Sequence, residues 1–523
     1  MRRALLIIFL VVTLGPPTAL IVQGVVSLAT NDRPPEATLG ARHWQLLATT
    51  VWLALCVSAA ATVIATPAAM VLGRTRRGPL IWLRRLALAT IIVPPYVHAL
   101  AWQTTAARLA AALSNLGFSM PVPAGWPMAW WVDTMAYLPL AFGLALVGLA
   151  SVDPDHLDAA RVGRRDAAAL WRVVLPLAGP QILAASGLVF VLALTDYGVP
   201  SLFQVSTYPL EVYVHFSRGG PPLGTLLQSL PLMAAAIVAI VLSQSGLRAA
   251  VTRPLRPAGV TATPLILPPW LRAVTGGAVA ILAAQVIVPI VSLITGVGSC
   301  DNLAGAVGEA REELLTTLVV ALVAAAVCLP LAAAVGHRLA ESRRGGRFWW
   351  IVTMLPIAVP APLVGIGLVV MWNRPLVGGV YGTLAMPILA VLARFAPLGC
   401  LVAAAQFRRV DPLLSDAARV FEPRTLHRWL RAALPTVAPG LLAAACVVAA
   451  LAAAELPATL IVAPPGQATL TMRIYNYLHY GASEAVAGLC LVATVSALLV
   501  AGLMSAVLRR WWFATGLAEE GRG

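Results

Sequence analysis

The sequence predicts an all-α polytopic membrane protein made of two parallel repeats of about six transmembrane helices. Hydrophobic residues make up 60% of the 523 residues and charged residues only 11%. This is too few charged residues to cover the surface of a soluble protein of this length, and lipid therefore has to cover part of the surface. Long apolar stretches recur along the chain, and one short segment between such stretches occurs twice, which indicates an internal duplication.

Twelve apolar stretches are long enough, at about 20 residues or more, to cross a hydrocarbon core of about 30 Å as helices. In the first half of the chain they lie at 4–28, 43–73, 79–103, 127–150, 178–203 and 225–248. In the second half they lie at 272–298, 314–340, 349–373, 384–407, 438–463 and 485–508. Met1-Arg2-Arg3 resembles the start of a signal peptide, but the apolar run exceeds a signal core of about 7–15 residues, which favours a retained helix.

Proline pairs interrupt the third stretch of each half. They are Pro94-Pro95 in the first half, and Pro356 with Pro360-x-Pro362 in the second. Proline removes a backbone donor, so these positions either break the helix where irregular backbone lines a cavity or act as packing kinks.

Arginines collect in alternate loops. The clusters lie at 2–3, 74–85, 161–172, 248–256, 338–347, 408–431 and 509–510. The intervening loops are poor in bases, and the positive-inside rule therefore places both termini in the cytoplasm. Topology and contact with anionic headgroups explain the formal charge of +15, so nucleic acid is not expected as a partner.

An even number of spans in each half predicts parallel repeats related by an axis along the membrane normal. The expected boundaries are a first transmembrane unit at 1–248, a proline-rich cytoplasmic linker at 249–271, a second transmembrane unit at 272–510 and a cytoplasmic tail at 511–523. Short paired segments in the two halves support the duplication. They are Thr49-Thr50 with Thr316-Thr317, Pro139-Leu140 with Pro397-Leu398, and Leu175-Pro176 with Leu434-Pro435.

The duplicated segment itself lies in a cytoplasmic loop of each half. Val152-Asp153-Pro154 and Asp158-Ala159-Ala160-Arg161-Val162 recur in the same register as Val410-Asp411-Pro412 and Asp416-Ala417-Ala418-Arg419-Val420. Paired alanines give a closely packing helical face with little side-chain entropy to lose, and an acid near the helix start suits the helix dipole. Each copy is therefore predicted to form a short docking helix.

Motifs for catalysis are absent. The sequence contains no lysine, which excludes the phosphate-binding loop that ends in Gly-Lys-Ser/Thr. It also lacks a Gly-x-Ser-x-Gly elbow and a His-Glu-x-x-His helix. The 6 cysteines and 7 histidines show no metal-ligand spacing. An enzyme is therefore not expected, nor is a cofactor or a bound metal.

Both loops resemble the EAA loop of permeases of binding-protein-dependent ABC importers, which begins Glu-Ala-Ala, has a glycine six positions after the glutamate and closes with Leu-Pro. The residues that carry this resemblance are Asp158, Ala159, Ala160, Arg161, Gly163, Leu175, Pro176, Asp416, Ala417, Ala418, Arg419, Leu434 and Pro435. The sequence departs from the pattern because Asp replaces Glu twice, Gly163 comes one residue early, and Glu422 stands where the second glycine is expected.

The resemblance covers nearly the whole chain as two fused permease units of the type I importer fold. It implies that each loop is a coupling helix seated in a cleft of one subunit of a cytoplasmic ATPase dimer. Two ATPase subunits and an extracytoplasmic solute-binding protein are the implied partners, and ATP hydrolysis belongs to the ATPase. The resemblance also implies a bacterial inner membrane as the location.

Two acidic segments narrow the resemblance. They are Thr195-Asp196-Tyr197-Gly198-Val199-Pro200 and Ala454-Glu455-Leu456-Pro457-Ala458-Thr459-Leu460. They resemble fused permeases of iron(III)-type importers and of their thiamine, polyamine and phosphonate relatives. Ferric iron is the implied substrate, with those relatives' substrates as alternatives. A twelve-helix secondary transporter is the alternative class, and it would need coupling-ion carboxylates deep in the membrane.

Charged groups inside a membrane are costly and therefore usually functional. The candidates for a gate or pathway are Asp196, Tyr197, Glu455, Pro457 and Arg394. The two acids either line the translocation path or lie hydrated at the interface beside a neighbouring base. Arg394 either lines a cavity between the halves or neutralises an acid such as Asp133.

Overall fold

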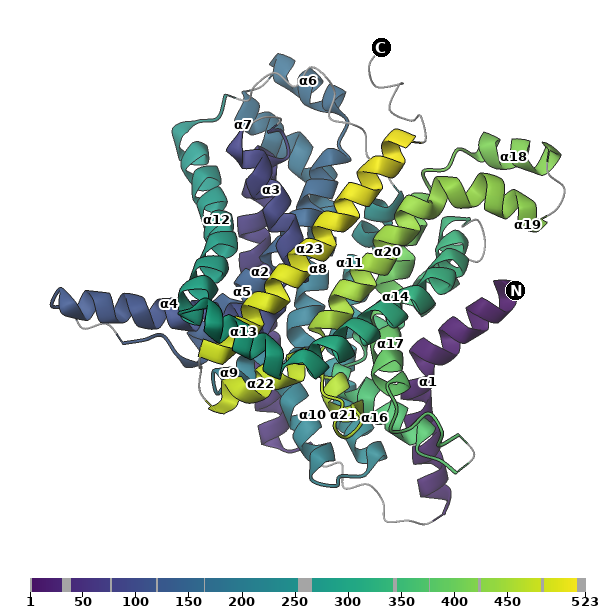
Figure 1. Ribbon diagram of the computed structural model, residues 1–523. Helices are drawn as coiled ribbons and strands as arrows, with labels where there is room; N and C mark the ends of the chain where they lie inside the picture. The colour runs from purple at the N-terminus through teal and green to yellow at the C-terminus, as the bar shows by residue number, and fades with distance from the viewer. Residues whose placement is uncertain are drawn as a thin grey trace.

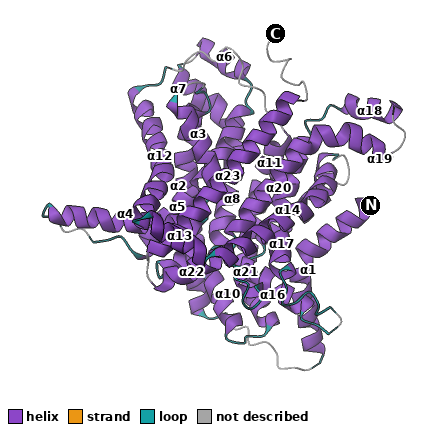
Figure 2. Cartoon of the chain, viewed as in Figure 1, coloured by secondary structure: helices purple, strands orange, loops and turns teal. Residues whose placement is uncertain are grey.

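The computed structural model describes residues 2–30, 39–75, 78–118, 121–163, 165–252, 266–341, 346–375, 377–421, 425–480 and 484–514. Within these ranges the chain forms helices and loops and no strand (Figure 2). The linker residues 253–265 lie outside them. We refer to the residues before and after this gap as the first and the second half.

Helices of the first half are α1 (Arg2–Ala29), α2 (Ala41–Leu72), α3 (Pro79–Ala89), the 3₁₀-helix η1 (Thr90–Ile92), α4 (Pro95–Asn115), α5 (Gly125–Ala150), α6 (Pro154–Gly163), α7 (Asp166–Ala169), the π-helix η2 (Leu170–Val174), α8 (Leu175–Thr195), α9 (Gly198–Leu202), α10 (Tyr208–Ser217) and α11 (Pro222–Thr252).

Helices of the second half are α12 (Pro269–Val297), α13 (Cys300–Glu309), α14 (Arg311–Ala340), α15 (Gly346–Met354), the 3₁₀-helix η3 (Leu355–Ala358), α16 (Ala361–Trp372), α17 (Ala385–Phe407), α18 (Pro412–Phe421), α19 (Thr425–Arg428), the π-helix η4 (Trp429–Ala433), α20 (Leu434–Ala454), α21 (Thr459–Val462), α22 (Leu470–Tyr480) and α23 (Glu484–Ala514).

The described residues contain 9 continuous helices that are long and apolar enough to cross a membrane, or up to 11 when each of two bent pairs counts as one span. The stretch expected at 485–508 lies in α23, where the described part that passes as apolar is the shorter segment Ala485–Ser496. The polytopic all-α fold class is therefore confirmed, and the described residues account for up to 11 of the twelve predicted spans.

The two bent pairs are the third stretches of the two halves. The chain turns by 115° between α3–η1 and α4, and by 98° between α15–η3 and α16. Pro95 begins α4 and Pro360 immediately precedes α16. Proline fits the first turn of a helix because the backbone N–H there has no partner within the helix. The proline pairs thus break these helices instead of kinking them, which is the first of the two alternatives that the sequence left open.

Each half has a core of closely packed helices. In the first half α2, α5, α8 and α11 pack together, and in the second half α14, α17 and α20 do so. Small residues form much of the contact surface, since Ala54, Ala61, Ala65 and Ala68 of α2 are all fully buried. Small side chains let membrane helices approach closely and gain dispersion energy where no hydrophobic effect drives association.

The first helix of each half packs mainly on the other half. Helix α1 contacts α16, α14 and α17, whereas α12 contacts α2 and α4 as well as α23. Figure 1 shows α1, in purple, beside the green helices, and α12, in teal, beside the purple ones. At the α1–α16 contact a side chain at Gly367 would overlap the backbone of Pro16. Glycine at this position therefore permits the close approach of the two helices.

One hydrogen bond occurs in both halves at corresponding places. The backbone N–H of Tyr208 donates to Thr50 Oγ1 at 2.8 Å, and that of Leu470 donates to Thr317 Oγ1 at 2.8 Å. Each bond ties the start of a short helix, α10 or α22, to a long helix, α2 or α14. The threonine hydroxyl accepts a helix-initiating N–H that has no partner within its own helix.

Candidate translocation cavity and coupling helices

A cavity of about 1440 Å³ lies between the two halves. Side chains from α5, α8 and the η1–α4 break form its wall on the first-half side, and α17, α18 and α20 form the opposite wall. The walls are mainly Leu, Val, Ile and Ala. The lining reaches from Phe421 at the end of α18 to Gly198 at the start of α9, so the cavity runs along the bundle between these two elements.

Four of the five predicted pathway residues line this cavity: Asp196, Arg394, Glu455 and Pro457. Arg394 forms an ion pair with Glu455, and 14% of the arginine side chain and 2% of the glutamate side chain are exposed. The structure thus places Arg394 on the cavity wall and pairs it with Glu455, not with Asp133.

The two acids are held in the same way. Asp196 Oδ1 accepts the backbone N–H of Gly198 at 2.8 Å, and Glu455 Oε1 accepts that of Ala458 at 2.8 Å. Each acid directly follows a long helix, α8 or α20. An N–H that donates to a carboxylate makes a stronger hydrogen bond than it would with a neutral acceptor, so both side chains have fixed positions.

The charges around them are not balanced. Both carboxylate oxygens of Asp133, which is fully buried on α5, and Asp196 Oδ2 have no hydrogen-bond partner among the described residues. Arg394 is the basic side chain that lines this end of the cavity. Burying a carboxylate without a donor or a counter-charge costs free energy. The carboxylates at this end of the cavity therefore carry a cost that their contacts offset only in part. We call this end the acid–arginine cluster, made of Asp196, Arg394 and Glu455.

Tyr197, the fifth predicted pathway residue, does not line the cavity. Its ring is 1% exposed and stacks on Tyr213, with 5.6 Å between ring centroids. Close by, the hydroxyls of Ser201 and Tyr475 lie 3.1 Å apart and join α9 to α22. Tyr197 therefore supports the packing behind the acid–arginine cluster, and a role for it in the pathway stays a prediction.

The other end of the cavity has a basic lining. Arg409 and Arg431 contribute to it, together with Ala417, Ala418 and Pro435 of the second predicted coupling loop. Leu434 begins α20 directly after the π-helix η4. Part of the second loop thus lines the cavity, in addition to exposing residues at the protein surface.

The first predicted coupling segment forms α6. Asp153 Oδ1 accepts the backbone N–H of Asp155 at 3.2 Å at its start, and Gly163 ends it. The Arg161 guanidinium lies 3.7 Å from the Asp158 carboxylate and 2.9 Å from that of Asp166. Asp166 also accepts the backbone N–H of Ile266 at 2.6 Å, so this loop is tied to the segment that precedes α12.

The second predicted coupling segment forms α18 and begins in the same way, because Asp411 Oδ1 accepts the backbone N–H of Leu413 at 2.9 Å. Asp416 and Ala417 are exposed, and Arg419 lies in the helix. Glu422 lies outside the described residues. In the first loop Ala159 is exposed and Ala160 is half-buried.

Both loops return to the membrane through a π-helix that ends at the Leu-Pro pair. The N–H of Leu175 donates to the carbonyl of Leu170, and that of Leu434 to Trp429. Pro176 and Pro435 come next and have no backbone N–H, so the regular α-helical hydrogen-bond pattern would lose a donor there. The wider π-helical turn lies at this position. In Figure 1, α6 and α18 lie at the end of the molecule where α23 approaches the C-terminus.

Both helices expose apolar side chains at this end. Val162 on α6 is 91% exposed, and Phe421 on α18 is 85% exposed. Leu413 and Val420 of α18 are also exposed. Apolar side chains that protrude together from short helices outside the membrane-spanning bundle are typical of a surface that a protein partner covers.

Several lining residues were missed from the sequence. Tyr137 lies beside the acid–arginine cluster, and Arg409 and Arg431 lie at the opposite end. The paired Pro139-Leu140 and Pro397-Leu398 segments place Tyr137 at the position of Phe395, the neighbour of Arg394. Comparing the halves in this register would have identified Tyr137 as a candidate, whereas nothing in the sequence distinguishes Arg409 from other loop arginines.

Two molybdenum transport system permease proteins named ModB, from Mycobacterium bovis and Mycobacterium tuberculosis, are each 30% identical to the chain over 196 residues, which is 33% of this chain and 72% of each relative. A putative molybdenum transport system permease protein, YvgM of Bacillus subtilis, is 32% identical over 112 residues, 20% of this chain and 48% of the relative. No family model matches the chain.

A polytopic helical bundle with a cavity between its two halves and exposed helices at one end is the architecture of a membrane transport permease. The similarity to the ModB proteins, of which the match covers 72%, gives the family. The chain belongs to the permeases of ABC importers, whose general partners are an ATPase and a solute-binding protein.

Proposed function

We propose that the chain is a fused permease in which residues 1–248 and 272–510 are two transmembrane units of one ABC importer. The cavity is the observation that supports this most directly, because helices of both halves form its walls. The order of elements supports it too, since a coupling helix, a π-helix and a Leu-Pro start follow one another in both halves. The cavity between the units is the translocation pathway.

The α6–α18 end faces the cytoplasm in this proposal, and both termini lie there. The cavity then reaches the cytoplasmic coupling helix α18, while the acid–arginine cluster lies toward the extracytoplasmic side. Movement of α17 relative to α20 would separate Arg394 from Glu455 and extend the cavity past α9. The ion pair is thus part of the extracytoplasmic gate.

Two ATPase subunits dock on the exposed apolar side chains of α6 and α18, one on each helix. Val162 and Phe421 would each be covered by one subunit, so ATP-driven closure of the ATPase dimer moves the two helices together. At the opposite end a solute-binding protein docks on the surface that includes α10 and α22. ATP hydrolysis belongs to the ATPase.

For the cargo we propose molybdenum in anionic form instead of ferric iron. The named relatives are molybdenum permeases, and Arg409 and Arg431 give the α18 end of the pathway positive charge. Among the described residues no group of three or more His, Cys, Asp or Glu side chains is placed to hold a metal ion. An oxyanion needs hydrogen-bond donors such as guanidinium groups, which these arginines supply.

The test is co-purification of the ATPase with the full chain, together with ATP-dependent uptake in proteoliposomes that contain the binding protein. Val162→Asp combined with Phe421→Asp should abolish both ATPase retention and uptake. Both positions are exposed, so the variant should fold. Phe118→Asp, at another exposed apolar position (68%), is the matched control and should keep both properties.

Cargo is tested in the same vesicles by supplying molybdate or ferric iron with the matching binding protein. Uptake of molybdenum that requires ATP supports the proposal, and uptake of iron under the same conditions would restore the assignment made from sequence. Retention of the ATPase by the double variant would contradict the coupling assignment. Flux driven by a proton or sodium gradient without ATP would identify a secondary transporter.

A further inference from the structure

A second cavity, of about 1070 Å³, lies away from the translocation pathway, between α1 and the end of α16. We call it the α1–α16 groove. Its lining consists of Leu10, Val11, Leu14, Gly15, Thr18, Ala19, Val22, Gln23, Val26, Ser27 and Thr30 of α1 and the following turn, and of Val369, Val370, Met371, Asn373, Arg374 and Pro375. It is separate from the acid–arginine cluster and from both coupling helices.

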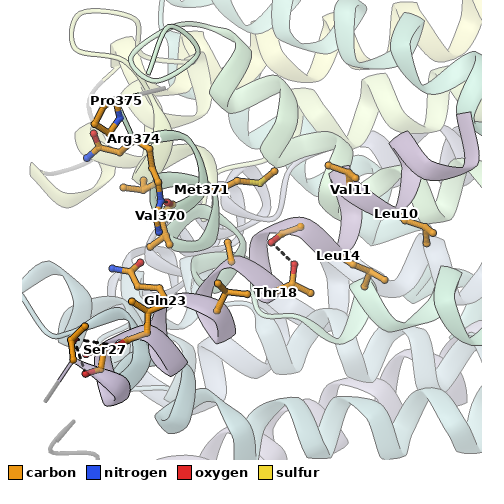
Figure 3. Close-up of a pocket in the computed structure, with 17 residues that line it drawn as sticks. Leu10, Val11, Leu14, Thr18, Gln23, Ser27, Val370, Met371, Arg374 and Pro375 are labelled. Atoms are coloured by element: carbon orange, nitrogen blue, oxygen red, sulfur yellow. Dashed lines mark hydrogen bonds between the residues drawn. The ribbon is translucent and has the colours of Figure 1, made fainter. Parts of the chain in front are cut away.

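The groove is apolar at one end and polar at the other. Figure 3 shows Leu10, Val11 and Leu14 at one end, and Arg374, Gln23 and Ser27 toward the other. Such a gradient along one groove matches an amphiphile, with a hydrocarbon chain in the apolar part and a polar group beside Arg374.

The groove opens to the surrounding lipid. Val11, Val22 and Val26 line it and are 47%, 60% and 55% exposed, and α1 is one of the membrane-spanning helices. Its polar end coincides with the ends of two helices, because α1 finishes at Ala29 and α16 at Trp372. Lipid headgroups lie at this level of a bilayer, where spanning helices end.

The length of the groove fits a single leaflet. From Leu10 to Gln23 the helix rises about 20 Å at about 1.5 Å per residue. One leaflet accounts for about half of a hydrocarbon core of about 30 Å. An acyl chain whose headgroup lies at Arg374 would therefore occupy the apolar part of the groove.

The polar end has unused hydrogen-bonding capacity. Arg374 Nε donates to the carbonyl of Val370 at 3.1 Å, and no ion pair with an acid of the described residues is formed there. Gln23 Oε1 is buried and has no donor among the described residues. A phosphodiester accepts from guanidinium, often through two bonds, and a headgroup hydroxyl can donate to the amide oxygen.

We propose that the α1–α16 groove binds one anionic phospholipid, with its phosphodiester on Arg374, a headgroup hydroxyl on Gln23 and an acyl chain along Leu14 and Val11. Phosphatidylglycerol has this chemistry. The lipid lies beside the contact of α1 with the second half, where Gly15 meets Met371. It fills the gap on the lipid side of this contact and holds α1 on α16.

The test is native mass spectrometry of the full chain, exchanged into micelles with equal amounts of phosphatidylglycerol and phosphatidylcholine of matched acyl chains. The wild type should retain phosphatidylglycerol preferentially. Arg374→Glu should lower this retention about tenfold, as expected when a charge-assisted hydrogen bond is lost. Arg218→Glu, at an exposed arginine at the end of α10, is the matched control and should retain lipid as the wild type does.

A second variant tests the acyl-chain site independently of charge. Leu14→Trp should fill the apolar part of the groove and reduce retention of both lipids. Retention of phosphatidylglycerol by Arg374→Glu at the level of the Arg218→Glu control would overturn the headgroup site. Unchanged retention by Leu14→Trp would overturn the acyl-chain site. Equal retention of the two lipids by the wild type would overturn the preference for an anionic headgroup.

Discussion

The guanidinium of Arg394 and the carboxylate of Glu455 form an ion pair that is almost completely enclosed, with 14% and 2% of the side chains exposed. The pair joins α17 to the turn that follows α20. Glu455 holds that turn further, because its own carbonyl accepts from Thr471 Oγ1 at 3.0 Å. One acid thus connects three parts of the second half at the end of the cavity.

Removing one partner of this pair should destabilise the protein. Glu455→Gln leaves Arg394 without a counter-charge in an enclosed site, which costs about 3 kcal/mol or more in buried pairs. The thermal denaturation midpoint in detergent should fall clearly. The double change Arg394→Met with Glu455→Leu removes both charges and should recover part of the loss. If the double variant loses as much as Arg394→Met and Glu455→Leu, each measured alone, added together, the two side chains are not coupled.

The duplicated threonine contacts should contribute equally in the two halves. Thr50→Val and Thr317→Val keep the side-chain shape but leave the N–H of Tyr208 or Leu470 without an acceptor, at a cost of about 1–3 kcal/mol each. Thermal denaturation measures the loss. Thr49→Val is the matched control, because Thr49 is half-buried and its Oγ1 donates to the carbonyl of Gln45 within its own helix. A loss for Thr49→Val as large as that for Thr50→Val would refute the assignment.

Close packing of α1 on α16 should be sensitive to one methyl group. Gly367→Ala places a Cβ against the backbone of Pro16, and overpacking of this kind costs about 1–3 kcal/mol. Gly276→Ala is the control, because a Cβ there would meet nothing within 4 Å and alanine is the better helix former. The thermal denaturation midpoint should fall in Gly367→Ala and should not fall in Gly276→Ala.

Acidic pH should weaken the α10 region. Burial, with the nearby His43, lowers the pKa of His215 below its ordinary value of 6.5, although Glu211 opposes this. Its Nδ1 lies 3.0 Å from Thr225 Oγ1. The folded state therefore binds a proton less readily than the unfolded state, so the stability present above pH 6.5 declines as the pH falls through the lowered pKa.

The measurement is the denaturation midpoint of wild type and His215→Gln between about pH 7.5 and pH 5. The variant should lose less stability than the wild type over this range. His156→Gln, at an exposed position on α6, should follow the wild type. Parallel curves for wild type and His215→Gln would show that other groups cause the pH dependence.

The sequence was sufficient to predict the all-α class and the two short helices of the duplicated loops. Hydropathy depends on composition over about 20 residues, and the acids that begin α6 and α18, Asp153 and Asp411, act on neighbouring backbone. These are local properties. The breaks after η1 and η3 could also be anticipated, because proline acts on the helix in which it occurs.

Long-range pairing could not be predicted in the same way. The sequence left Arg394 either lining a cavity or neutralising an acid such as Asp133, and only the positions of α17 and the turn after α20 show that its partner is Glu455. Tyr197 adjoins Asp196 in the chain, yet its ring turns away from the cavity and stacks on Tyr213. Hydropathy likewise gives no information on where α1 packs, because an apolar helix can pack on either half.

The position of α1 has a consequence for how this protein is made. Ala29 ends α1, but its principal neighbour α16 begins only at Ala361. At usual rates of synthesis the ribosome needs on the order of tens of seconds to cover that interval. During this time α1 is inserted without its final contacts, so a helix that is made well before α16 takes its final position only after α16 has been made. Conditions that slow elongation should therefore expose nascent chains to membrane proteases before α1 has docked.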